Sequence, residues 1–371
     1  MERRTHRPRI ADVARVAGVS KTAVSFAFNN PARLSPETAV RIREVAETLG
    51  YRPHPVARML AQRRTMTLGV LTPQALSVIF SNPFFALFNE GVARAAEERG
   101  YGLHFISPIL GSLATAIGRA SVDGVVAIGL SAEHPEVGQI RSAGLPMVLV
   151  DSEDLPEHGS VVVDDEGGAG AAAAHLLELG HRNVLILTVE AAHAGRDGGP
   201  SGSGERRSAR GQPDALDVTT RRLRGYELAF ESAGLPIDPA WIIAGRASID
   251  GGTLAFQRAW ALSLRPTAVL AMSDAMAIGV IRAARDLDLR VPDDLSVVGF
   301  DDIDLAANVD PALTTVHQPI RQKGYEAVRL LLEDVEQGTS PVRHLRLDTR
   351  LIVRGSTAPP RAGREVPATP A

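Results

Sequence analysis

The sequence predicts an α/β protein in which a small head of three helices precedes a larger body of parallel sheets. Residues 10–29 have the pattern of two short helices joined by a tight turn, and from residue 67 onward apolar strands alternate with helices. Such alternation is typical of parallel sheets covered by helices. Charge is also divided unevenly between the two parts, which suggests that they have different partners.

The head begins with an apolar helix face formed at helical spacing by Ile10, Val13, Ala14 and Ala17. Gly18 breaks the pattern, and Ser20 stands at the N-cap of a second helix. That helix leaves four residues on one outer side: Lys21, Thr22, Ser25 and Phe26. A helix-turn-helix places such residues against base edges in the major groove. A plain helical hairpin in a core would show the same pattern and is the alternative.

A third helix is predicted from Ser35 as N-cap and Pro36 at the first helical position, and it ends at Gly50. The following residues 53–64 contain one short apolar helix, which would be unstable in water alone. We expect a hinge that folds at DNA and inserts an apolar wedge into the minor groove. The alternative is a plain linker.

Composition supports a basic head on an acidic body. Residues 1–64 hold 13 Arg and Lys against 5 Asp and Glu, a net charge of +8, whereas the whole chain carries −3. A cationic module of this kind is expected to meet a polyanion. The chain has no cysteine, no apolar run long enough to span a membrane and no apolar segment behind its basic N-terminus, so we expect a cytoplasmic protein.

The body is predicted to alternate strands and helices along its whole length. The expected strands are 67–72, 103–107, 122–130, 146–151, 160–163, 183–189, 241–244, 268–272, 296–299 and 345–354. The expected helices are 84–99, one that ends at 180, 221–233, 252–262, 274–286 and 320–337. Residues 195–220 are rich in Gly, Ser, Arg and Pro and are predicted to be a disordered insertion, as is the tail 359–371.

One motif resembles the glycine-rich fingerprint of a dinucleotide-binding site. Residues 168–173 fit G-x-G-x-x-A after an apolar strand. Three acidic residues, Asp164, Asp165 and Glu166, separate strand from glycines and would repel a pyrophosphate. We therefore expect an alanine-rich helix there. No P-loop, HExxH or GxSxG motif occurs in the sequence, so we expect neither an enzyme nor a cofactor or metal.

The head and the hinge together resemble the lac/gal repressor family of bacterial transcription regulators. The matching segments of the head are ADVARVAGVSKTAVSFAFN and SPETAVRIREVAETLGYRPHPVARML. The body matches through SNPFF, VDGVV, HLLELGHRNV, RLRGY, SDAMAIG, VPDDLSVVGFDD and PALTTVHQP. The resemblance implies two α/β lobes, like those of sugar-binding periplasmic proteins, joined by three crossovers. We place these near Val163, Gln318 and Gly338.

This resemblance implies a helix-turn-helix domain at 1–52, a hinge helix at 53–66 and an effector-binding and dimerisation domain at 67–358. Lobe one would comprise 67–162 and 319–338, and lobe two 163–318 and 339–358. Lys21, Thr22, Ser25 and Phe26 would lie over base edges, after the N-cap Ser20. Ala57 and Leu60 match hinge positions that open a central base step. The family usually has arginine at the position of Phe26. The phenylalanine lacks the donor that arginine offers to guanine, but it can make an apolar contact with a thymine methyl. Arg33 is a candidate for phosphate contact.

For the effector, ligands of such folds bind at the carboxyl ends of parallel strands. Asp301 follows a strand at such an end, and the matches to GFDD and RLxGY place Asp301 and Arg222 in the cleft. A carboxylate and a planar guanidinium suit vicinal hydroxyls. Phe84 and Phe85 match aromatic positions at the cleft edge, and one of them is expected in the core. Ser273 and Asp274 cap the next helix and reach toward the cleft, with N-capping alone as the alternative for Asp274.

The sequence thus favours a cytoplasmic, dimeric DNA-binding repressor that binds a near-palindromic double-stranded operator. We expect a small molecule, a sugar, to control this binding. Two alternatives are an extracytoplasmic sugar-binding protein and an NAD-dependent enzyme. The basic DNA-binding head opposes the first alternative, and the acidic residues before the glycines oppose the second.

Overall fold

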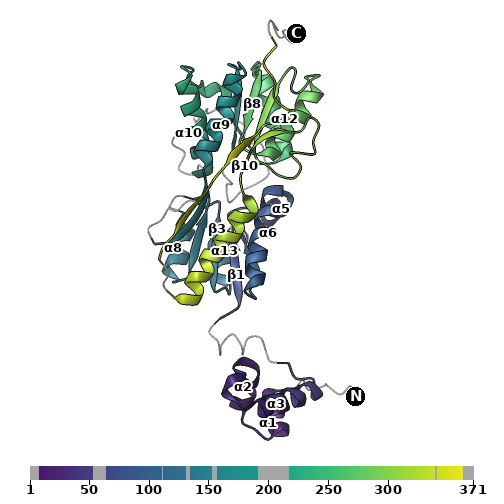
Figure 1. The fold of residues 1–371 in the computed structure, drawn as a ribbon, viewed down its shortest axis with the longest axis vertical. Coiled ribbons are helices and arrows are strands. Elements are labelled where there is room, and N and C mark those ends of the chain that lie inside the picture. Colours follow the sequence, from purple (N-terminus) through teal and green to yellow (C-terminus); the bar gives the residue numbers. More distant parts are fainter. Residues whose placement is uncertain are drawn as a thin grey trace. The chain divides into compact units, whose positions relative to one another are not determined.

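The structure, a computed structural model, describes residues 8–52, 64–110, 112–130, 134–152, 157–190, 217–338 and 341–361. The chain divides into two compact units, Met1–Met66 and Thr67–Ala371 (Figure 1). This division lies at the end of the predicted hinge. The hinge residues 53–63, with Ala57 and Leu60, lie outside the described residues.

The first unit is the predicted head of three helices. Its elements are α1 (Ile10–Ala17), α2 (Lys21–Asn29), the 3₁₀ turn η1 (Pro31–Arg33) and α3 (Pro36–Thr48). Val13, Val24, Ala27 and Ile42 are fully buried between the helices. Gly18, at φ 66°, forms the turn between α1 and α2, because a left-handed backbone favours glycine there.

In the second unit the first lobe is built on a sheet whose strands are all parallel. Its order is β11-β5-β4-β3-β1-β2. The strands are β1 (Thr67–Leu71), β2 (Gly102–Ile106), β3 (Gly124–Ile128), β4 (Met147–Val150), β5 (Gly159–Val163) and β11 (His344–Leu347). The helices of this lobe are α5 (Leu76–Ser81), α6 (Pro83–Glu98), α7 (Leu113–Arg119), α8 (Pro135–Ser142) and α13 (Ile320–Gln337). Figure 1 shows α13 beside α6, and the two helices pack together closely because Gly91 and Gly324 lie between them.

The second lobe contains the sheet β12-β10-β9-β8-β6-β7, parallel except for β12, which runs antiparallel to β10. The strands are β6 (Val184–Val189), β7 (Ile242–Gly245), β8 (Ala268–Ala271), β9 (Ser296–Asp301), β10 (Thr314–His317) and β12 (Arg350–Ile352). The helices are α9 (Asp165–Glu178), α10 (Asp217–Ser232), η2 (Pro239–Trp241), α11 (Ile249–Ala261) and α12 (Asp274–Asp286). Helix α9 is the predicted alanine-rich helix, and it begins at the acidic residues.

The lobe boundary predicted near Gly338 is wrong. Strand β11 pairs with β5 in the first sheet, so residues 341–347 belong to lobe one. The chain enters lobe two only at Asp348 and Thr349, where the Thr349 hydroxyl donates to the Asp164 carbonyl at 2.9 Å. The predicted single strand 345–354 is therefore two strands, one in each sheet. The apolar pattern of residues 345–354 continues through the crossover between the lobes, so the sequence does not show where the crossover lies.

Several other elements also differ from the prediction. Strand β10 was not predicted, because it is only four residues long and lies between Pro311 and Pro319. Helix α10 begins at Asp217 and not at 221, and the buried Thr219 donates to the Val189 carbonyl at 3.4 Å, which anchors its first turn. Arg361 forms ion pairs with Asp293 and Asp294, so residues 359–361 are ordered against lobe two. Residues 191–216 and 362–371 lie outside the described residues.

Candidate functional site

The outer surface of α2 carries the side chains predicted to meet DNA. Ser20 caps the helix, and its hydroxyl accepts from the Ala23 backbone N–H at 3.1 Å. Lys21 and Thr22 are exposed, whereas Ser25 and Phe26 are half-buried. The N-terminal turn of α2 therefore presents a cation and a hydroxyl to solvent.

Phe26 has a cationic neighbour from the next element. The exposed Arg33 places its guanidinium carbon 5.2 Å from the Phe26 ring centroid. At the same end of α2, Arg43 donates to the Ala27 carbonyl at 3.2 and 3.3 Å, and this fixes α2 against α3. The geometry gives Phe26 a packed position beside an exposed arginine.

In the second unit a cleft of about 750 Å³ opens between the two lobes. Five of the six predicted effector residues line it: Phe84, Phe85, Arg222, Ser273 and Asp301. Lobe one also contributes Gln74, Asn82, Ile128, Gly129, Leu130 and Asp151, and lobe two Val189, Val218, Thr219, Ala247 and Met272. The walls combine apolar side chains with a few charged groups, as is typical of small-molecule sites.

Asp274 does not face this cleft, and its predicted place among the effector residues is wrong. The N-cap of α12 is Ser273, whose hydroxyl accepts from the Met276 N–H at 3.3 Å. Asp274 is fully buried; it accepts from the Ile303 N–H at 2.9 Å and from the Thr315 hydroxyl. Burial, followed by the nearby Asp301 carboxylate, raises the pKa of Asp274 well above its ordinary value.

The two phenylalanines have different environments, as expected. Phe85 is buried in the core of lobe one, and Phe84 is half-buried with its ring edge-on to Phe85 at 5.3 Å between centroids. Asn82 caps this helix by accepting from the Phe84 N–H at 3.0 Å, and its amide donates to the Ala247 carbonyl of lobe two at 3.2 Å. Phe84 is therefore the ring available to a ligand.

Arg222 is held rigidly at the wall of lobe two. Its Nε donates to Asp165 at 2.8 Å, its Nη1 donates to the Met272 carbonyl at 2.6 Å, and its guanidinium lies 3.5 Å over the Phe300 ring. Burial would lower the pKa of Arg222, but the Asp165 and Asp301 carboxylates raise it above its ordinary value. The guanidinium remains charged and has little freedom to rotate.

Asp301 ends β9 with an unusual backbone, at φ 123°. Its Oδ1 accepts from the Gln318 amide at 2.6 Å and lies 3.9 Å from Nη1 of Arg222. Burial raises the pKa of Asp301 to about 6, against the opposing effects of Arg222, Gln318 and Lys323. The carboxylate thus titrates close to the physiological range.

Five polar residues in or beneath the cleft were missed by sequence reasoning: Asp151, Asp165, Arg221, Gln318 and Lys323. Asp151 lines the cleft directly after β4, so the carboxyl-end argument used for Asp301 would have found it. Lys323 is one of two lysines and is fully buried on the inner face of α13, where an apolar residue is expected. A single charged residue on an otherwise apolar helix face was the signal from which Lys323 could have been predicted as a site residue.

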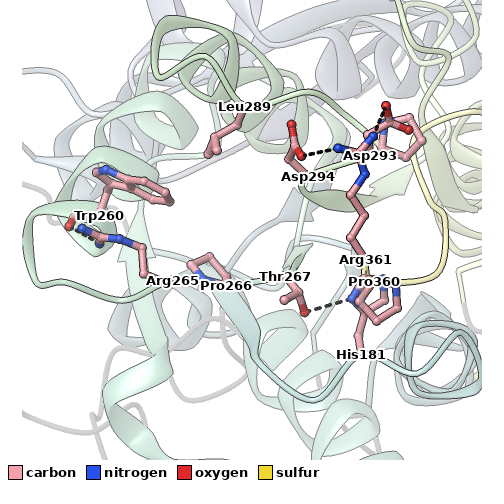
Figure 2. Close-up of a pocket in the computed structure, with 11 residues that line it drawn as sticks. His181, Trp260, Arg265, Pro266, Thr267, Leu289, Asp293, Asp294, Pro360 and Arg361 are labelled. Carbon is pink, nitrogen blue, oxygen red and sulfur yellow. Dashed lines mark hydrogen bonds and ion pairs between the residues drawn. The ribbon is translucent and has the colours of Figure 1, made fainter. Parts of the chain in front are cut away.

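A second hollow, of about 570 Å³, lies in lobe two away from the cleft. Figure 2 shows Arg361 beside Asp293 and Asp294 on one side and Trp260 with Arg265 on the other. Its charged groups are paired with one another or with backbone carbonyls. The ion pairs of Arg361 therefore hold the C-terminal residues 360 and 361 against lobe two, at the edge of this hollow.

Two further findings concern metals and membranes. Within the described residues, no cluster of three or more His, Asp or Glu side chains is arranged to hold a metal ion. None of the described helices is both long enough and apolar enough to cross a bilayer.

Both units of the chain match known protein families. Residues 9–54 match "Bacterial regulatory proteins, lacI family" and residues 173–357 match "Periplasmic binding protein-like domain". The HTH-type transcriptional repressor PurR of Aliivibrio fischeri (strain MJ11) is 31% identical, over 94% of this chain and 97% of its own length. A structure of the regulator CelR in complex with cellobiose is 28% identical, with a TM-score of 0.67, covering 94% of this chain and 100% of its own.

The fold is also that of a lac repressor dimer bound to operator and the anti-inducer ONPF, with a TM-score of 0.76 at 24% identity, over 95% of this chain and 100% of that one. The recognition-helix head, the two-lobed body and the match over nearly the full length of a relative lead to one conclusion: this chain is a member of the lacI family of bacterial regulatory proteins.

Proposed function

We propose that the protein is a transcriptional repressor that binds a near-palindromic operator as a dimer and responds to a small polyhydroxylated effector. The observation that carries the proposal is that one chain joins a head whose helix α2 exposes Lys21 and Thr22 to a body whose cleft, between two lobes, sets a few charged groups in largely apolar walls. A two-fold dimer would present two heads to two half-sites, which accounts for the operator symmetry.

In the head, we assign base contacts to Lys21, Thr22, Ser25 and Phe26, with Ser20 as the cap that orients them. Arg33 adds a cation at the edge of this surface. Ala57 and Leu60 would supply the apolar wedge in the minor groove. The outward-facing side of α2 supports the roles in the head, and the family to which the chain belongs supports those of the hinge residues as well.

In the body, we assign effector contacts to Phe84, Arg222 and Asp301, with Phe85 and Ser273 completing the wall. A guanidinium and a carboxylate 3.9 Å apart suit neighbouring hydroxyls, and Phe84 offers a ring to the apolar face of a sugar. The solved CelR relative holds cellobiose, which supports a sugar as the ligand class.

We further propose a plan of the domains and a place of action. The head comprises residues 1–52, the hinge 53–66 and the body 67–358, with residues 359–361 added to the body by the ion pairs of Arg361. The protein would act in the cytoplasm, where its operator lies, and as a regulator without catalytic activity.

Selection of bound fragments from genomic DNA by the full-length protein tests the proposal. We expect a symmetric motif to be enriched and its binding to fall with salt, with a log–log slope of about −0.9 for each phosphate neutralised. Lys21→Ala should weaken binding, whereas Arg41→Ala, an exposed arginine on α3 outside the proposed surface, serves as the matched control. A binding constant indifferent to salt, or equal losses in both variants, would contradict the assignment.

A further inference from the structure

Beneath the cleft, seven residues form a closed ring of buried or half-buried polar contacts that spans both lobes. We call it the floor ring; its members are Asp151, Asp165, Arg221, Arg222, Asp301, Gln318 and Lys323. Three of these residues also line the cleft, namely Asp151, Arg222 and Asp301. The groups that a ligand would meet are therefore tied to groups that it cannot reach.

Lys323 is fully buried, and none of its side chain reaches solvent. Its ammonium donates to the two Asp151 carboxylate oxygens at 2.7 and 2.9 Å, and to the Gln318 amide oxygen at 2.6 Å. These three contacts use all three ammonium protons. The nitrogen also lies 5.4 Å from the centroid of the Phe84 ring.

Gln318 carries the contact from lobe one to lobe two. Its oxygen accepts from Lys323 on α13, and its nitrogen donates to Asp301 on β9 at 2.6 Å. This arrangement fixes the amide orientation, because the reverse would place two donors and two acceptors face to face. Lys323 is thus connected to both cleft carboxylates, directly to Asp151 and through Gln318 to Asp301.

The rest of the ring returns to lobe one. Asp165 is fully buried and accepts from Arg222 at 2.8 Å and from Arg221 at 2.9 and 3.1 Å. The Arg221 guanidinium also donates to the Asp151 carbonyl at 3.4 Å, which closes the ring. Burial would raise the pKa of Asp165, but Arg222, Arg221 and Lys323 lower it below its ordinary value.

The charges of the ring balance one another. Its three cations, Lys323, Arg221 and Arg222, face three carboxylates, Asp151, Asp165 and Asp301. The charged groups that line the cleft itself, however, are two carboxylates, Asp151 and Asp301, and one guanidinium, that of Arg222. This guanidinium is already bound to Asp165. A phosphate or carboxylate ligand would find no uncommitted cation among these cleft-lining groups, whereas hydroxyl groups would find two acceptors.

We propose that Lys323 is a positioning residue of the effector cleft, and that by fixing Asp151 and, through Gln318, Asp301 as acceptors it restricts the cleft to uncharged polyhydroxylated ligands. The inference rests on the proposed function of the cleft and narrows its ligand class. Phosphorylated sugars and nucleotides are excluded by it.

The first test compares neutral sugars with their phosphates on the full-length protein. The probes are ribose, glucose and cellobiose, then ribose 5-phosphate and glucose 6-phosphate within an arrayed panel of such pairs, and the readout is the midpoint of thermal unfolding. We expect a neutral member to raise the midpoint and its phosphate to leave it unchanged. A phosphate that binds as well as its neutral partner overturns the inference but leaves the effector cleft standing. If no compound of either kind raises the midpoint, the result counts against the proposed function itself.

The second test uses variants and the neutral sugar that stabilises the protein most. Lys323→Met keeps the volume of the side chain but removes the counter-charge of Asp151, and we expect at least tenfold weaker binding of the sugar. Asp151→Asn leaves Lys323 unbalanced, so the ratio of phosphate to neutral affinity should rise at least tenfold. That change of preference separates positioning of the acceptor from a role in folding alone.

Two controls complete the design. The double variant Lys323→Met with Asp151→Asn removes both charges. Its thermal midpoint should therefore lie above that of Lys323→Met, in which Asp151 is left without its counter-charge, while its sugar affinity stays low. Arg329→Met, on the same helix and paired only with Glu326 and Glu333, should bind the sugar like the unchanged protein. Sugar affinity within twofold of the unchanged protein in Lys323→Met, or affinity restored in the double variant, overturns the role of Lys323.

Discussion

Replacement of Arg222 by methionine should destabilise the body as well as weaken effector binding. The residue is 4% exposed, and its loss leaves Asp165, which is fully buried, with Arg221 as its remaining ion-pair partner among the described residues. Removing one partner of a buried, hydrogen-bonded ion pair costs about 3–5 kcal/mol, because the remaining charge is left uncompensated. Since about 1 kcal/mol shifts the melting midpoint by about 2–4 °C in domains of 150–250 residues, we expect a fall of at least about 6 °C.

Differential scanning calorimetry of the full-length protein at pH 7 measures this effect without a ligand. Arg224→Met is the matched control, because Arg224 lies two residues further along α10, is exposed and meets Glu227 only at 4.0 Å. Adding Asp165→Asn to Arg222→Met should restore at least half of the loss, since the buried charge disappears. A midpoint within 2 °C of the unchanged protein, or no recovery in the double variant, would refute the reasoning about the buried pair.

Three further predictions concern pH, packing and DNA preference. Because the pKa of Asp301 is raised to about 6, protonation below that pH removes an acceptor; effector affinity measured by titration calorimetry should fall by up to about tenfold per pH unit below 6, and Asp301→Asn should flatten the profile. Gly225→Ala should lower the thermal midpoint, since a Cβ there would overlap the Glu166 carbonyl of α9, whereas Gly138→Ala, which meets nothing within 4 Å, should leave it equal or higher. Phe26→Arg should shift the preferred base at one position of each half-site toward guanine in selection from random duplexes, because arginine donates to both guanine acceptors; an unchanged motif would remove Phe26 from the base-contacting set.

The head and most of the second unit could be predicted from sequence because their signals are local. Ser20 and Ser35 occupy cap positions that depend only on the next few residues, and both cap in the structure. The alternation of apolar strands and helices likewise predicted parallel sheets, and the family resemblance implied their division into two lobes. What failed was the allocation of β11 and β12, because the pairing partner of a strand lies far away in the chain and is not encoded in its own pattern.

The cleft could be predicted in part, for the same reason. Asp301 lies at the carboxyl end of a strand, a position that sequence reasoning can find. The orientation of Asp274 could not be predicted, because a place in the first turn of a helix does not decide toward which neighbour a side chain points. Lys323 and Asp151 are separated by 172 residues, so their pairing appears only once α13 has packed over the first sheet.

The three connections between the lobes are all short. They consist of Asp164, of Gln318 with Pro319, and of Asp348 with Thr349. With three tethers this brief, the lobes cannot drift apart or slide independently; the movement left to them is rotation about the line of the tethers. A ligand that contacts both walls would therefore act chiefly on one angle, that between lobe two and the lobe from which the chain continues toward the head.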